Sequence, residues 1–150
     1  MSPQAKLRTY WSRTDSQTKP VGSSEAEVAR LEARVGVRLP DDFRAYLLTS
    51  APNGQHVLDD NLIGWWSAGE IKSIPEEYPH DLTNPAVAEN PGHFLFFADY
   101  CMWCWAWVIG CGEGEHRGKV AVIGGQNDRF VANSFSEFID LYVADPNAVD

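Results

Sequence analysis

A helix begins at the stretch Leu39-Pro40-Asp41-Asp42-Phe43. Proline suits the first helical turn because its missing N–H has no partner there, and the two aspartates lie where the helix dipole favours negative charge. Phe43, Tyr46 and Leu47 then form an apolar face, which predicts that the helix is buried on one side. The turn-forming residues Ala51-Pro52-Asn53-Gly54 are expected to end it.

Another helix is predicted just before this one. Ser24 and Glu27 have the spacing of a capping box, in which each side chain accepts a hydrogen bond from the backbone amide of the other residue. An apolar stripe follows, formed by Val28, Leu31 and Val35. Gly36 is well placed to end the helix in the left-handed conformation.

The C-terminal end of the chain repeats this pattern. Ser134 and Glu137 form a second predicted capping box. The apolar positions after it have helical spacing: Phe135, Phe138, Ile139 and Tyr142. Asp145-Pro146 is expected to end this helix.

The segments between these helices have the composition of strands. They are residues 94–98, 102–109 and 119–123, followed by a turn at 124–128 into residues 130–132, with shorter strands at 56–58 and 62–66. Residues 74–91 are rich in proline and predict a long loop. Two helices, a mostly antiparallel sheet and a closing helix predict an α+β fold.

The length of 150 residues predicts one domain. We place it at residues 23–150, after a loosely ordered tail over residues 1–22 in which Trp11 can contact the domain. The chain contains no apolar run that would span a bilayer and no secretory signal at its start. We therefore expect a cytoplasmic protein that does not interact with membranes.

The order of these motifs resembles that of the SUKH superfamily, which includes fungal cell-wall-synthesis regulators of the Smi/Knr type and many bacterial immunity proteins. The resemblance covers residues 23–145. It rests on Leu39-Pro40-Asp41-Asp42-Phe43-Arg44, which leads through Tyr46-Leu47-Leu48 to Asn53-Gly54, and on residues 131–138. It implies a sheet with two N-terminal helices and one C-terminal helix packed on it, and a non-enzymatic binding function. Many members carry a Gly-Asp pair after the first core strand, where this chain has residues 99–107 instead.

The negative charge is concentrated in the middle of the chain. The formal net charge is -9, and residues 52–116 contain ten acids and one base, Lys72. Such a surface repels nucleic acid and anionic lipid and favours a basic protein partner, although an acidic surface also serves solubility. The predicted partner-binding residues are Asp59, Asp60, Glu70, Glu76 and Glu77, together with Trp65 and Trp66.

Three alternating tryptophans have two interpretations. Trp103, Trp105 and Trp107 would share one face of a strand. That face can be an ordinary core, or part of an exposed aromatic surface together with Trp65 and Trp66. The sequence leaves both interpretations open.

The cysteines predict no cofactor. Cys101 and Cys104 have the spacing of half a zinc site, but on a strand their side chains would point to opposite faces. The neighbouring acids and apolar residues also disfavour a nucleophilic thiolate. We predict no metal and no catalytic residues.

These patterns together predict a protein-binding module that catalyses no reaction. The leading hypothesis is a bacterial immunity protein that neutralises a basic toxin domain by direct binding. A regulatory adaptor with an endogenous protein partner is the alternative. An enzyme or metal protein built on Cys101, Cys104 and Cys111 is a third hypothesis.

Overall fold

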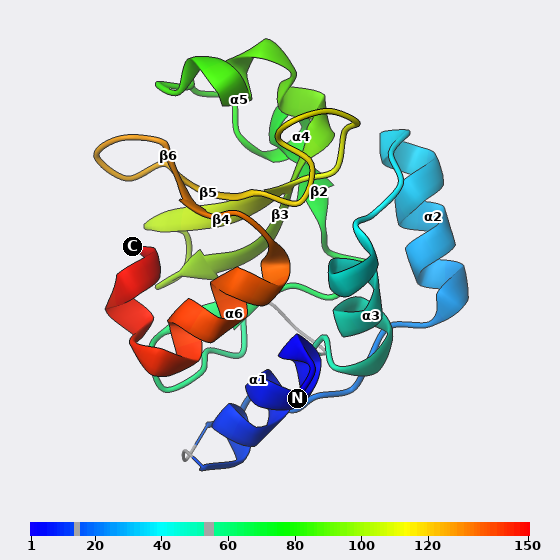
Figure 1. Cartoon of the computed structure of the whole chain (residues 1–150), viewed down its shortest axis with the longest axis vertical. Coiled ribbons are helices and arrows are strands. Elements are labelled where there is room, and N and C mark those ends of the chain that lie inside the picture. Colours follow the sequence, from blue (N-terminus) through cyan, green and yellow to red (C-terminus); the bar gives the residue numbers. More distant parts are fainter. Residues whose placement is uncertain (14–15, 53–55) are drawn as a thin grey trace.

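The computed structural model describes residues 1–13, 16–52 and 56–150. A 6-stranded sheet runs through the middle of it (Figure 1), and every strand pair is antiparallel. The strands are β1 (Ile63–Trp65), β2 (Lys72–Ser73), β3 (Phe94–Tyr100), β4 (Trp105–Gly110), β5 (Val120–Ile123) and β6 (Arg129–Ala132). Their order is β1-β3-β4-β5-β6, and β2 also pairs with β3. The predicted α+β fold is confirmed.

The first two predicted helices are α2 (Glu25–Val35) and α3 (Asp41–Thr49). The capping box of α2 is present, since the amide of Glu27 donates to Ser24 Oγ at 3.1 Å and the amide of Ser24 donates to Glu27 Oε1 at 3.0 Å. Gly36 ends α2 with a φ of 70°. Pro40 is the N-cap residue of α3, whose predicted apolar face is fully buried. Two residues of the predicted turn after α3, Asn53 and Gly54, lie outside the described residues.

The closing helix is α6 (Phe135–Ala144), and its four predicted apolar residues are all buried. Ser134 accepts a hydrogen bond from the amide of Glu137 at 3.0 Å. The carboxylate of Glu137 accepts from the amide of Asn133 at 3.2 Å, one residue before the predicted donor.

Aromatic side chains fill the space between the sheet and the helices α3 and α6. The ring of Phe97 on β3 lies 5.3 Å from that of Phe138 and 5.7 Å from that of Phe43. Trp65 on β1 lies 5.3 Å from Tyr142. These edge-to-face contacts join α3, α6 and the two strands into one core.

The N-terminal residues differ from the prediction of a loosely ordered tail. Residues Pro3–Arg13 form helix α1, which packs on α6 and α3 (Figure 1). Leu7 and Trp11 are buried, and Tyr10 makes an edge-to-face contact with Tyr142. The apolar stripe of α1 consists of these three residues, which is too short to give the sequence a sustained helical period.

The proline-rich segment also contains short helices where the sequence predicts a loop. They are α4 (Ile74–Glu77), α5 (Pro85–Glu89) and the 3-10 helix η1 (Pro91–His93). The amide of Ser73 donates to Glu76 Oε1 at 2.8 Å, and Asn84 Oδ1 accepts from the amide of Ala86 at 2.9 Å. Helices of three to five residues show no period in a sequence, so the sequence predicts only a loop here.

The described part of the chain has no helix with the length and hydropathy needed to cross a bilayer.

Candidate functional site

The turn between β3 and β4 contains an uncommon backbone conformation. Cys101, Met102 and Trp103 have φ values of 47°, 59° and 76°. A left-handed conformation costs an L-residue roughly 1–2 kcal/mol, so three in succession are a local strain. The sequence predicts a strand from residue 102, whereas β4 begins only at Trp105. Met102 projects from this turn with 71% of its surface exposed.

Hydrogen bonds from the sheet hold this turn. The amide of Trp103 donates to Asp99 Oδ2 at 2.7 Å, and Trp66 Nε1 donates to Asp99 Oδ1 at 2.7 Å. The amide of Cys101 donates to the carbonyl of Leu62 on the neighbouring chain segment at 2.8 Å. Burial raises the pKa of Asp99, although the hydrogen bonds from the Trp66 side chain and from the Trp103 amide lower it. A buried carboxylate therefore compensates part of the strain of the turn.

The left-handed turn removes Trp103 from the face that the sequence predicts for all three tryptophans, whereas Trp105 and Trp107 alternate on β4. Trp107 is fully buried beside α6. Trp105 is half-buried and stacks on Tyr100, with ring centroids 4.3 Å apart. Trp103 turns back to the other side of the sheet, where it stacks on Tyr78 at 5.8 Å and meets Phe96 edge to face. The prediction of one shared face is wrong for Trp103, because the chain is not extended at residues 101–103.

A cavity of about 390 Å³ opens beside Trp103. Its lining consists of Glu77, Tyr78, Pro79, His80, Trp103, Cys104 and Gly124. The two stacked rings are nearly parallel, with an angle of 8° between their planes. Tyrosine, tryptophan and methionine are enriched at protein interfaces, so the cavity and the neighbouring Met102 have the composition of a protein-binding surface.

Three of the predicted contact residues lie in the core instead of on the surface. Trp65 and Trp66 are 0% and 1% exposed, and Asp59 is 3% exposed. Asp59 accepts hydrogen bonds from Trp65 Nε1 at 3.0 Å and from the amide of Ile63 at 3.0 Å. These side chains cannot touch a partner without unfolding β1, and we therefore remove them from the proposed contact set.

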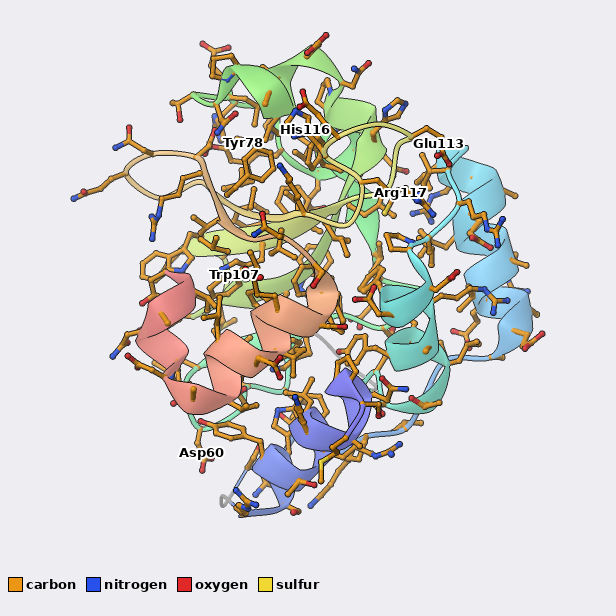
Figure 2. The ribbon with its side chains drawn as sticks, in the orientation of Figure 1. Asp60, Tyr78, Trp107, Glu113, His116 and Arg117 are labelled. Atoms are coloured by element: carbon orange, nitrogen blue, oxygen red, sulfur yellow. The ribbon has the colours of Figure 1, made fainter. Side chains whose placement is uncertain are left out.

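The other four predicted contact residues do not form one surface. Asp60 lies at the lower end of the molecule in Figure 2, whereas Tyr78, which follows Glu77 in the chain, lies near the upper end. Glu70 accepts hydrogen bonds from the backbone and hydroxyl of Ser67. Glu76 and Glu77 lie together in α4, next to the cavity.

The structure adds acidic residues that the sequence-based contact set omitted. Glu89, Glu113 and Glu115 line a small cavity of about 60 Å³ between α5 and the loop before β5. Asp81 lies on the segment that joins α4 to α5 and is exposed. We call the acids of α4, of the segment after it and of the small cavity the acidic end: Glu76, Glu77, Asp81, Glu89, Glu113 and Glu115. Asp81, Glu89, Glu113 and Glu115 are among the ten acids counted in the sequence, in which Glu89 is far from Glu113 and Glu115.

The cysteines do not diverge as predicted, because residues 101–104 form a turn. Cys104 Sγ lies 3.4 Å from the carbonyl oxygen of Cys101. Among the described residues, no group of three or more His, Cys, Asp or Glu side chains is arranged to hold a metal ion. Burial raises the pKa of Cys104, and it raises that of Cys111 to about 12, which disfavours a nucleophilic thiolate at either residue.

A substitution of Met102 tests the strain in the turn. Met102→Gly is expected to raise the free energy of unfolding by about 0.5–1 kcal/mol relative to Met102→Ala, because glycine adopts a positive φ without a steric penalty. Urea unfolding of both variants measures the difference. If Met102→Gly were the less stable variant, the left-handed conformation of residue 102 would be refuted.

Comparison with protein-family models gives one match. Residues 22–141 match the SMI1 / KNR4 family (SUKH-1), which covers both predicted helix motifs, the sheet and most of α6. A comparison with curated proteins yields no match. The chain belongs to the SMI1 / KNR4 (SUKH-1) family.

Proposed function

We propose that this protein is an immunity protein that binds a cognate basic toxin domain directly and blocks it, and that it catalyses no reaction. Membership of the SUKH-1 family supports a protein-binding module. The acidic end is the observation that carries the finer proposal, because Glu77 lines the aromatic cavity and Glu89, Glu113 and Glu115 line the small cavity together. A toxin that acts on nucleic acid or nucleotides needs a basic groove, and an acidic surface that covers this groove would exclude the substrate by charge and shape.

Part of the acidic end is available for an external cation. Glu76 pairs with Arg34 at 3.2 Å and Glu77 pairs with Lys72 at 3.5 Å. Within the described chain, no salt bridge reaches Asp81, Glu89 or Glu113. Glu115 Oε1 lies 3.5 Å from His116 Nε2, and the side chain of Glu115 is 84% exposed. These four carboxylates support fast, salt-dependent binding of a basic surface.

The first experiment identifies the partner. Tagged protein is incubated with lysate of cells that express the neighbouring genes, at low and at high salt. We expect recovery of a basic protein that arrests growth when expressed alone and does not arrest growth when co-expressed with this chain. A partner without toxicity would contradict the immunity proposal and would favour the regulatory adaptor.

Charge reversal then tests the acidic end. The double variant Glu113→Lys with Glu115→Lys is expected to weaken the affinity for this partner roughly 10- to 100-fold at low salt, because like charges at an interface are repelled. The loss should shrink at high salt. Isothermal titration calorimetry measures the affinities at low and at high salt. The matched control is Glu25→Lys with Asp41→Lys, which changes the net charge by the same amount on exposed residues of α2 and α3. Equal losses in the two double variants would show that net charge matters and that the acidic end does not.

A further inference from the structure

The Tyr78–Trp103 cavity has features of a binding site for a single side chain. Tyr78 and Trp103 line it with parallel rings, and Glu77 belongs to the same lining. Trp103 is held from behind by the edge-to-face contact with Phe96 at 5.1 Å and by the hydrogen bond from its amide to Asp99. The aromatic wall is thus fixed before any partner arrives, which lowers the entropy cost of binding.

The backbone opposite the rings keeps the cavity open. Gly124 has a φ of +89°, and a Cβ added there would lie 3.3 Å from Cζ3 of Trp103 and 3.7 Å from Cε1 of Tyr78. Any larger side chain at this position would occupy the space in front of the rings. The amide of Gly124 donates to Asp128 Oδ1 at 3.1 Å, and this hydrogen bond holds the glycine in place.

The charges around the cavity favour a cation. Glu77 lies in the lining, and Asp99 and Asp128 lie behind it. Burial raises the pKa of Tyr78, and the nearby carboxylate of Asp128 raises it further. The phenol is therefore neutral, so its ring keeps the ordinary quadrupole that attracts cations. Lys72 Nζ lies 3.5 Å from Glu77 Oε2, and the side chain of Lys72 is 51% exposed, so it can be displaced by a competing cation.

We propose that the Tyr78–Trp103 cavity binds an arginine side chain of the partner protein, with the guanidinium against the two rings and its N–H groups donating to Glu77. Arginine fits better than lysine because its planar group stacks on aromatic rings and donates to a carboxylate at the same time. This inference deepens the proposed function, since the arginine belongs to the basic toxin domain. An apolar side chain is the competing occupant. It is less favoured because it could not interact with the carboxylate of Glu77.

The test uses small probes and the full chain. N-acetyl-arginine amide is titrated into ¹⁵N-labelled protein, and N-acetyl-citrulline amide serves as the neutral probe of nearly the same shape. We expect a saturable shift of the Trp103 indole N–H signal with arginine and at least roughly 5-fold weaker binding of citrulline, as a cation–π contact would give. N-acetyl-leucine amide reports on the apolar alternative. Equal binding of arginine and citrulline, or tighter binding of leucine, would overturn the proposal.

Two variants in the same titration separate a binding role from a structural role. Glu77→Gln is expected to weaken arginine binding about 2- to 5-fold, which corresponds to one partly exposed ion pair. Lys72→Gln removes the internal cation beside Glu77 and is expected to strengthen arginine binding about 2-fold. A merely structural disturbance would not produce opposite effects. Glu113→Gln is the control and should leave arginine binding unchanged.

These experiments distinguish a failure of the arginine site from a failure of the immunity proposal. If the probes bind as expected but the recovered partner is not toxic, the immunity proposal fails and the arginine site stands. If a toxic partner is recovered and Glu77→Gln and Tyr78→Leu bind it with full affinity, the arginine site is refuted and the immunity proposal stands.

Discussion

Asp59→Ala is expected to lower the free energy of unfolding by about 3–5 kcal/mol. The carboxylate of Asp59 accepts four hydrogen bonds: from the amides of Asn61 and Ile63, from Trp65 Nε1 and from the hydroxyl of Tyr142. Alanine would leave three buried donors and the part-buried amide of Asn61 without this acceptor. Urea unfolding measures the change, which should appear in the midpoint with an unchanged slope.

The neighbouring carboxylate provides the matched control. Asp60 is exposed, and Asp60→Asn is expected to change the free energy of unfolding by less than about 0.5 kcal/mol. If Asp59→Ala does not fold, Asp59→Asn keeps one acceptor and still measures the site, with an expected loss of about 2 kcal/mol. A loss below about 1 kcal/mol in Asp59→Asn would contradict the role of this carboxylate.

The network around Asp59 also connects distant elements. Asn61 Nδ2 donates to the hydroxyl of Tyr10 at 2.7 Å and to that of Tyr142 at 3.0 Å. Helices α1 and α6 are therefore joined to the segment before β1 through one polar cluster. Burial and the charge of Asp59 both raise the pKa of Tyr142, so its hydroxyl stays protonated and continues to donate. The buried carboxylate thus acts within the core.

The helices could be predicted because their signals are local. The capping residues Ser24 and Glu27 lie three positions apart, and the apolar stripe of α6 lies within eight residues. Interactions of this kind depend on spacing alone. The role of Asp59 could not be predicted, because its partner Tyr142 is 83 positions away in the sequence. Two adjacent aspartates look equivalent in a sequence even when one is buried and the other exposed.

The turn at residues 101–103 was mispredicted for the opposite reason, since the local preferences are misleading there. Tryptophan favours strands, and a left-handed conformation is disfavoured for every residue in this stretch. The hydrogen bond from Trp103 to Asp99 and the contacts of its ring with Tyr78 and Phe96 favour the turn instead. Residues held in a locally disfavoured backbone conformation are often functional, which is consistent with the proposed role of the cavity.

Trp107→Ala is expected to lower the free energy of unfolding by about 3–5 kcal/mol, the usual cost of deleting a buried aromatic side chain. Trp107 is 0% exposed, its Nε1 donates to the carbonyl of Val149 at 2.7 Å, and its ring lies 6.1 Å from that of Phe138. The 3-10 helix η2 (Pro146–Val149) would lose its hydrogen bond to the sheet. Differential scanning calorimetry should show a melting temperature lower by roughly 10 °C.

Trp103→Ala is the matched control, because it is the same chemical change four positions earlier at a half-buried ring. We expect it to cost less than about 2 kcal/mol of stability and to weaken partner binding. Trp107→Ala, measured below its melting temperature, should bind the partner with unchanged affinity because its side chain lies on the α6 side of the sheet. A larger stability loss in Trp103→Ala than in Trp107→Ala would reverse this assignment. Trp103 would then contribute more to core packing than Trp107 does, and packing alone would explain the strained turn.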